Sequence, residues 1–467
     1  MKELSKNEAL AKELFYKPEY PADKNESVLK EAQAFCEGYK AFLDAGKTER
    51  EATNEAERQL LAAGYEGYDD RKVYSAGDKI YFVNRDKSIV ASTIGSKSME
   101  EGFRLNISHG DVPRLDLKPN PLYEKAHLSL LQTHYYGGVR KYQWVATPLA
   151  IHGVFCKANG EVVSVSIGEE PGDPVFCITD LLPHLGREQN QRTLCDGIRG
   201  EELNVIIGST AVVEDGLKDS VKLKTMMLLN EKYGIVEKDF LRAEIEIVPA
   251  GKARDVGFDR GLVGAYGQDD RVEAYPALIA EIETKNPAFT TVYVMTDKEE
   301  VGSDGVTGMQ SMYVFHYLQQ LCKVHNADYI RACRNSKCLS ADVTAAYDPT
   351  FDSAFEAQNG NYAGRGVALA KYTGSGGKGG ASDASAELVA YVAGLCDAEN
   401  IAWQIGEMGR IDLGGGGTIA KFVAKQGIDT LDIGVPVLSM HAPFELTHKI
   451  DIYMAYKAFA AFNNAKV

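Results

Sequence analysis

Two adjacent glutamates, Glu299 and Glu300, stand in the segment "TDKEEVGSDG", directly after the apolar run at residues 292–295. The run predicts a buried strand, so both carboxylates are expected at the end of a core element. A buried charge without a partner is costly and shifts its own pKa instead. We therefore expect a counter-charge beside this pair.

Four other segments place acids or histidines after apolar strands or at the start of a helix. They are "LNISHGDVP" with His109 and Asp111, "GQDDRVEAYPAL" with Asp269 and Asp270, "CLSADVT" with Asp342, and "VPVLSMHAPFE" with His441 and Glu445. Taken singly, the aspartates could cap helices or turns, and each histidine could be an ordinary core residue. Together, two imidazoles and several carboxylates without a thiolate form a ligand set for Zn²⁺, Mn²⁺ or Co²⁺.

The donors suffice for two ions if one carboxylate bridges them. Paired ions about 3.5–4 Å apart are a common hydrolytic arrangement, which holds an attacking water between them. In that arrangement one glutamate of the pair binds metal and the other takes a proton from the water. The spacing does not decide which of the two glutamates has which role.

The elements that must position these residues follow an α/β pattern. Apolar strands alternate with helical segments after residue 255, which predicts a mixed sheet with helices on both faces. Ligands in such folds gather at the carboxyl ends of the strands. Residues 129–255 are rich in strands and turns instead. We predict a discontinuous α/β domain at 1–128 and 256–467, interrupted by a mainly β domain at 129–255.

Composition excludes several other classes of protein. The 467 residues include 45% hydrophobic ones, which is ordinary globular content, and the net charge is −15. Such an acidic chain is not expected to bind nucleic acid or an anionic membrane. No segment reads as a signal peptide or a membrane span, and the eight cysteines are scattered. The sequence therefore predicts a cytoplasmic protein without a disulfide framework.

Five segments in order resemble the M18 aminopeptidases, of which aspartyl aminopeptidase is typical: "ISHGDVPRLDLKPNP", "GQDDRV", "TDKEEVGSDGVTGMQS", "LSADV" and "SMHAPFE". The resemblance covers essentially the whole chain. It implies a metallo-aminopeptidase with two divalent ions per subunit, zinc or else manganese or cobalt, that acts on the N-termini of peptides.

The resemblance also assigns roles to individual residues. His109 and Asp342 would complete one metal site, Glu300 and His441 the other, and Asp269 would bridge the ions. Glu299 would be the general base for a hydroxide held between them, and Asp111 would orient the neighbouring ligands.

The resemblance further makes the α/β domain the catalytic one and implies that the inserted domain drives self-association, as dimers that build a tetrahedral dodecamer. A histidine of the inserted domain then reaches the active site of a neighbouring subunit. The segment "DLLPHLGRE" makes His184 the candidate for this role, polarising the scissile carbonyl. One departure concerns specificity: where better-known members carry histidines, this chain has Ala345 and Asp348, so the preferred N-terminal residue stays open.

Two glycine-rich segments, 374–380 and 414–417, allow competing interpretations. The first matches G-x-G-x-x-G, but no acid suited to a dinucleotide ribose follows it. We expect instead a loop at the rim of a substrate pocket, in which Lys378 could bind a carboxylate. Two alternatives to the aminopeptidase remain: a related deacylase or carboxypeptidase-like hydrolase, and a non-catalytic assembly protein that keeps the fold.

Overall fold

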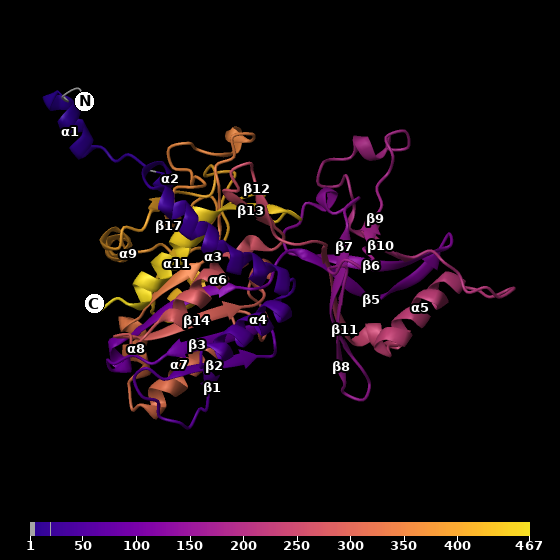
Figure 1. Cartoon of the computed structure of the whole chain (residues 1–467), viewed down its shortest axis with the longest axis horizontal. Coiled ribbons are helices and arrows are strands. Elements are labelled where there is room, and N and C mark those ends of the chain that lie inside the picture. Colours follow the sequence, from indigo (N-terminus) through magenta and orange to yellow (C-terminus); the bar gives the residue numbers. More distant parts are fainter. Residues whose placement is uncertain (1–4, 19) are drawn as a thin grey trace.

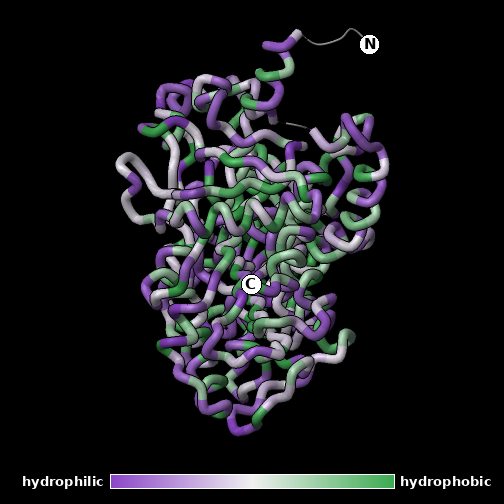
Figure 2. The backbone as a smooth tube through the Cα atoms, turned by 90° about the vertical axis from the view of Figure 1, so that its left-hand side faces the viewer, coloured by the Kyte–Doolittle hydropathy of each residue, from purple (hydrophilic) through white to green (hydrophobic). Residues whose placement is uncertain are grey.

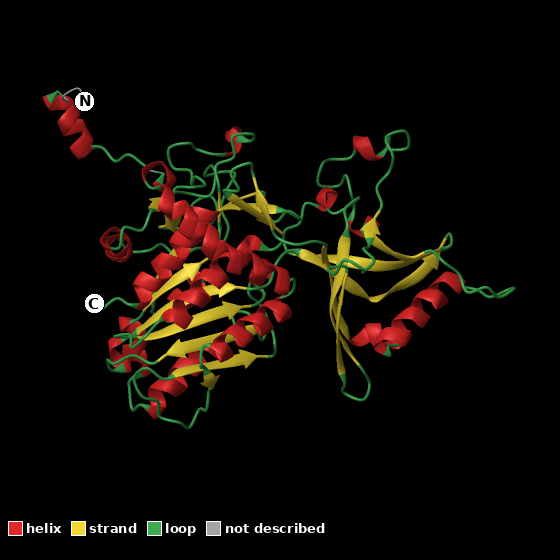
Figure 3. Cartoon of the chain, in the orientation of Figure 1, coloured by secondary structure: helices red, strands yellow, loops and turns green. Residues whose placement is uncertain are grey.

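A nine-stranded sheet forms the centre of the larger of two bodies in the computed structural model, which describes residues 5–18 and 20–467 (Figures 1 and 3). Its strands, in spatial order, are β1 (Glu66–Gly67), β2 (Lys79–Asn84), β3 (Ser88–Thr93), β14 (Thr290–Thr296), β4 (Phe103–His109), β15 (Lys337–Ala341), β19 (Asp429–Gly434), β17 (Val367–Ala370) and β18 (Trp403–Ile405). The four strands from β14 to β19 are parallel neighbours. The sheet is mixed, as the sequence predicted.

Helices cover both faces of this sheet. One face packs against α3 (Glu26–Ala45), α4 (Glu49–Ala62), α6 (Gln268–Glu283), α9 (Ala386–Ala398) and α11 (Lys449–Asn463), and the other against α7 (Tyr313–Val324), α8 (Tyr329–Asn335) and α10 (Ala420–Ala424). Successive residues of a strand point to opposite faces. A hydrophobic core lies on each face. In β14, accordingly, Tyr293 and Met295 pack into the first core, beside α6 and α11, whereas Val292 and Val294 pack into the second core on the other face.

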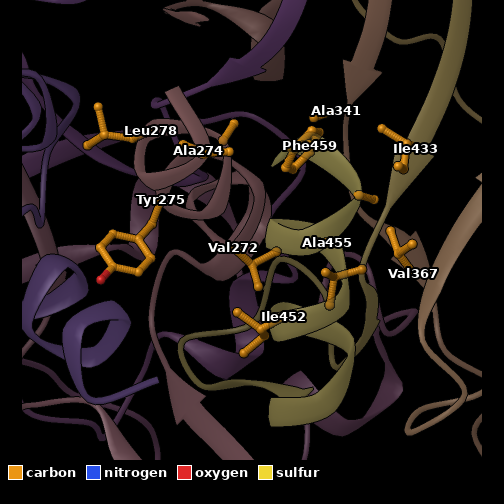
Figure 4. Packing of buried hydrophobic residues seen from close by; sticks show 14 of the residues in the cluster. Val272, Ala274, Tyr275, Leu278, Ala341, Val367, Ile433, Ile452, Ala455 and Phe459 are labelled. Atoms are coloured by element: carbon orange, nitrogen blue, oxygen red, sulfur yellow. The ribbon is translucent and has the colours of Figure 1, made fainter. Parts of the chain in front are cut away.

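The first core is built mainly around α6 and α11, which lie side by side against the sheet (Figure 4). Val272 of α6, with Ile452 and Phe459 of α11, is fully buried there. The hydrophobic parts of the chain lie largely inside the molecule, with hydrophilic segments around them (Figure 2). α6 is therefore held firmly, and its first residues include Asp269 and Asp270. Two further helices, α1 (Lys6–Leu14) and α2 (Pro21–Lys24), precede this body.

The smaller body is an antiparallel seven-stranded sheet (Figure 3). Its strands, in spatial order, are β8 (Val162–Ile167), β7 (Leu149–Cys156), β11 (Ala243–Pro249), β5 (Arg114–Lys125), β6 (Leu128–Tyr136), β10 (Asn204–Gly208) and β9 (Cys177–Ile178). The helix α5 (Ser220–Tyr233) packs against β5, β6 and β10. The sequence pattern had not predicted this helix.

The seven-stranded sheet begins before the predicted boundary at residues 128 and 129, because β5, which starts at Arg114, belongs to it. Pro119 and Pro121 lie within β5, although proline is disfavoured inside a strand. In the structure the pairing of β5 with β6 shifts register between Leu117 and Leu122. Prolines are tolerated at such irregularities, where the ladder of hydrogen bonds is interrupted.

A third, five-stranded sheet lies beside the ends of the central strands. Its strands are β12 (Arg254–Val256), β13 (Leu262–Ala265), β21 (Glu445–His448), β20 (Pro436–Leu438) and β16 (Thr344–Ala345). β13 leads into α6, and the loop between β20 and β21 carries His441. Among the described residues, no helix has the length and apolar character needed to cross a membrane.

Candidate metal centre

Four of the predicted residues lie at the carboxyl ends of three neighbouring parallel strands. His109 is the last residue of β4, and Asp342 follows β15. Glu299 and Glu300 follow β14 in a short 3-10 helix, η6 (Glu299–Val301). Because β14, β4 and β15 are parallel neighbours, these side chains meet at one edge of the sheet.

Asp269, at the start of α6, and His441, in the loop between β20 and β21, reach this edge from two segments that a single carboxylate holds. The Oε2 atom of Glu445 accepts the backbone N–H groups of Gln268 at 2.6 Å and Asp269 at 3.2 Å. Its Oε1 atom accepts the N–H of His441 at 2.7 Å. Glu445 is fully buried in β21, the strand that follows the His441 loop. The sequence placed Glu445 four residues after His441 but gave no sign of this role.

The two oxygens of Asp269 face the two histidines. Asp269 Oδ1 lies 3.3 Å from His109 Nε2, and Asp269 Oδ2 lies 3.0 Å from His441 Nε2. Glu300 Oε1 is 3.6 Å from His441 Nε2, whereas Glu299 Oε2 is 4.0 Å from His109 Nε2. Ligand atoms of Asp342 also lie within 4.8 Å of those of His109 and Glu299. All the predicted ligands are therefore in one cluster, with Asp269 between its halves.

Both imidazoles are oriented with Nε2 toward the cluster. His109 Nδ1 lies 2.9 Å from the carbonyl oxygen of Asp111, and His441 Nδ1 lies 3.0 Å from that of Gly138. A carbonyl can only accept a hydrogen bond, so each Nδ1 carries the proton. In the neutral form of each ring, Nε2 then carries the lone pair that can bind a metal ion. The carbonyl of Gly138 is a main-chain group, which no residue pattern could have indicated.

Asp111 holds the glutamate pair in place. Its Oδ1 accepts the N–H of Glu299 at 3.0 Å, and its Oδ2 accepts the N–H of Glu300 at 3.2 Å. Its Oδ1 also lies 3.4 Å from His109 Nδ1. Asp111 therefore contacts both the imidazole and the neighbouring glutamates.

The cluster has a large excess of negative charge. Five carboxylates, of Asp269, Asp270, Glu299, Glu300 and Asp342, surround two histidines, and no lysine or arginine within the described ranges forms an ion pair with the five. Burial raises the pKa of Glu300 and Asp342 well above the usual range, and neighbouring carboxylates raise both further. Burial also raises the pKa of Glu299. The counter-charge that the glutamate pair requires is therefore not a lysine or an arginine.

In His441, hydrogen bonding to Asp269 and burial act on the pKa in opposite directions. Burial alone would lower the pKa of this imidazole, but the bond to Asp269 and the negative charges of Asp269, Glu300 and Glu445 together outweigh burial and raise it to about 11. Hydrogen bonds with His109 and His441 hold the pKa of Asp269 below its usual range despite burial.

Buried atoms without hydrogen-bond partners show that the cluster suits cations. Among the described residues, His109 Nε2, Asp269 Oδ1, Asp270 Oδ1 and Glu300 Oε1 are all buried and unpartnered. Such groups are rare in folded proteins because each loses its hydration without compensation. Imidazole nitrogen and carboxylate oxygen are ligands that Zn²⁺, Mn²⁺ and Co²⁺ accept. The residues present therefore fit divalent metal ions.

A cavity of about 140 Å³ adjoins the cluster at Asp342. Both glycine-rich segments line it, and Lys378 lies in its wall. The Nζ atom of Lys378 lies 3.3 Å from Asp383 Oδ2 and 3.6 Å from the centre of the Tyr372 ring. The first glycine segment connects β17 to α9, as its position in the sequence indicated. It forms part of a pocket wall beside the candidate metal ligands.

His184, unlike the other predicted catalytic residues and the metal ligands, is not part of the cluster that the described residues form. It lies in an exposed loop of the seven-stranded body, after β9. No candidate metal-binding group found among the described residues includes it.

Replacing Glu445 with glutamine is expected to lower the affinity for divalent metal about 10–100-fold, the range usual when residues supporting metal ligands are lost. A glutamine offers one acceptor oxygen where Glu445 uses two, so either Asp269 or His441 loses its anchor. Zn²⁺ titration against a competing chelator measures the change. Glu387→Gln, at an exposed position in the first turn of α9, is the matched control. An unchanged affinity in Glu445→Gln would contradict this role.

Comparisons with known proteins indicate the family to which the chain belongs. A family model described as "Aminopeptidase I zinc metalloprotease (M18)" matches residues 42–463. A probable M18 family aminopeptidase 1 of Borrelia garinii is 47% identical over 436 residues, covering 92% of this chain and 95% of that protein. The crystal structure of an M18 aminopeptidase from Thermotoga maritima superposes with a TM-score of 0.92 at 39% identity, covering 96% of this chain and 100% of that one.

A more distant structure, yeast Ape1 solved as a dodecamer, shares the fold. Its TM-score is 0.75 at 19% identity, over 93% of this chain and 97% of that one. The family match spans both bodies and the whole ligand cluster. The chain belongs to the M18 family of zinc metallo-aminopeptidases.

Proposed function

We propose that the protein is a dinuclear aminopeptidase that removes single residues from the N-termini of peptides. The observation that carries the proposal is the position of Asp269, whose two oxygens face two separate histidines. His109 and Asp342 would hold one ion, His441 and Glu300 the other, and Asp269 both. The 3.6 Å distance from Glu300 to His441 supports Glu300, rather than Glu299, as the ligand on that side.

When bound, the ions would polarise the scissile carbonyl and make the attacking water more acidic. Glu299 would accept the proton of that water and later deliver it to the leaving amine. Asp111 would keep Glu299 in place through the backbone N–H bond at 3.0 Å. The side chain of the N-terminal residue would enter the cavity beside Asp342, whose wall includes Lys378.

We further propose that the seven-stranded body mediates self-association, as dimers within a larger assembly. The yeast relative with this fold forms a dodecamer. His184 is exposed on this body. In such an assembly it would reach the substrate carbonyl in a neighbouring subunit and stabilise the oxyanion.

Removing the metals is expected to abolish the release of N-terminal residues, and adding Zn²⁺, Mn²⁺ or Co²⁺ should restore it. Peptides headed by Asp, Glu, Leu and Lys would be incubated with metal-free and reloaded protein, and the free amino acid quantified. N-acetylated peptides are the control, because an aminopeptidase needs a free terminal amine. Hydrolysis of the acetylated peptides, or equal activity of the metal-free protein, would contradict the proposal.

A further inference from the structure

Residues 136–138, which connect β6 to the following loop, contact the candidate metal centre. They belong to the smaller, seven-stranded body, called here the inserted body. Tyr136 closes β6, and its hydroxyl donates to Asp111 Oδ2 at 2.7 Å. The carbonyl of Gly138 accepts the Nδ1–H of His441 at 3.0 Å. The inserted body therefore contributes one contact to each half of the candidate metal centre.

The carboxylate of Asp111 depends on Tyr136 for its orientation. Three donors hold it: the N–H groups of Glu299 and Glu300, at 3.0 and 3.2 Å, and the Tyr136 hydroxyl, at 2.7 Å. The hydroxyl bond is the shortest of the three, and hydrogen bonds to an ionised acceptor are among the stronger ones. Without it, Oδ2 keeps only the longest bond, and the turn that presents both glutamates loses a fixed support.

The ring of Tyr136 is itself held at the junction of the two bodies. Arg114, its cross-strand partner in β5, places its guanidinium 3.9 Å from the ring centre. The same guanidinium lies 3.3 Å from Glu49 of α4 and 3.2 Å from Glu246 of β11. Arg114 is thus bonded to both bodies while it stacks on Tyr136.

A continuous series of contacts therefore runs from the domain junction to the glutamates: Glu49 and Glu246, then Arg114, Tyr136, Asp111, and finally the Glu299–Glu300 turn. All of these side chains are nearly or fully buried except that of Glu299, which is partly exposed. Gly137 permits the close approach, since a Cβ there would lie 3.2 Å from Glu300 Oε2. A shift of the inserted body would therefore move the supports of Glu299, Glu300 and His441 together.

We propose that Tyr136 is a positioning residue for the metal centre and makes metal binding dependent on the placement of the inserted body. This inference rests on the proposed dinuclear centre. It assigns to the inserted body a role within each subunit, separate from its proposed role in assembly. Tyr136 touches neither substrate nor metal in this scheme and acts only through Asp111.

The test compares Tyr136→Phe, which removes only the hydroxyl, with Tyr135→Phe, a neighbouring and partly exposed tyrosine with no bond to the cluster. Tyr136→Phe is expected to bind Zn²⁺ about 10–100-fold more weakly. Fully loaded, it should show a lower kcat at nearly unchanged KM. The visible spectrum of the Co²⁺-loaded protein should also change, because the ligand geometry changes. Tyr135→Phe should match the wild type in all three measurements.

A second variant, Arg114→Lys, keeps the positive charge but loses the planar group that stacks and bonds to both bodies. Its metal affinity should also fall, as in Tyr136→Phe. The double variant should lose less than the sum of the two single losses, since both act through Tyr136. Full additivity would mean that Arg114 does not act through Tyr136, which would overturn the link to the inserted body.

Melting temperatures of the metal-free proteins separate positioning from folding. Weaker metal binding by Tyr136→Phe with an unchanged metal-free Tm supports the inference. Unchanged metal affinity per folded molecule overturns it, whether or not Tm falls. A wild type that binds no metal would contradict the proposed function instead, so the two failures are distinguishable.

Discussion

Glu299→Gln is expected to lower kcat about 10²–10⁴-fold, the usual contribution of a general acid–base group. Glutamine has nearly the same shape but cannot accept the proton of the attacking water. Its backbone N–H can still donate to Asp111, so the turn that carries Glu300 should persist. Metal content should remain that of the wild type, because no proposed ligand is changed. Steady-state kinetics together with metal analysis of the same sample measure both quantities.

Asp304→Asn is the matched control for this variant. It makes the same kind of change, carboxylate to amide, at an exposed position in the same loop. Its kcat should equal that of the wild type. If Glu299→Gln keeps full activity with its metals in place, the base is another group. If it loses activity together with metal, Glu299 is a ligand, and the assignment of the two neighbouring glutamates must be exchanged.

The strand ends at which the site lies could be predicted from the sequence, because buried parallel strands are short apolar runs and the polar residue after each run is easy to see. His109, Asp342 and the glutamate pair all follow such runs, and the structure brings them together. Their proximity follows from the order of three parallel strands. Which strands are neighbours is a property of the whole chain, so the resemblance to a family was needed to connect the segments.

The contacts that hold the metal ligands in place could not be predicted from the sequence. Glu445 acts on main-chain N–H groups of Asp269 and His441, and Gly138 acts through its own carbonyl. Neither interaction leaves a residue pattern, since any chain has such groups. The start of the inserted body at Arg114 was missed for a related reason: prolines are read as loop residues unless the register shift that accommodates them is known.

Asp269→Ala is expected to have the largest effect on metal binding, because one side chain faces both histidines. Loss of a shared ligand weakens both sites. A metal ion contributes several kcal/mol to such a reaction, so activity should fall roughly 10³-fold or more. Calorimetric titration of metal-free protein with Zn²⁺ measures the number of sites and their affinities. Asp215→Ala, in an exposed loop of the inserted body, is the control for the substitution itself.

Comparison with Asp270→Asn tests whether Asp269 is the shared ligand or whether the adjacent aspartate could serve equally. Asp270 Oδ2 accepts the N–H of His109 at 3.2 Å, and an asparagine oxygen can keep that bond. Asp269→Asn, in contrast, leaves one histidine facing an amide nitrogen, which cannot bind a cation. Metal binding should therefore fall much further in Asp269→Asn than in Asp270→Asn. Equal losses would show that the two aspartates share the role, and a larger loss at Asp270 would assign the bridge to that residue.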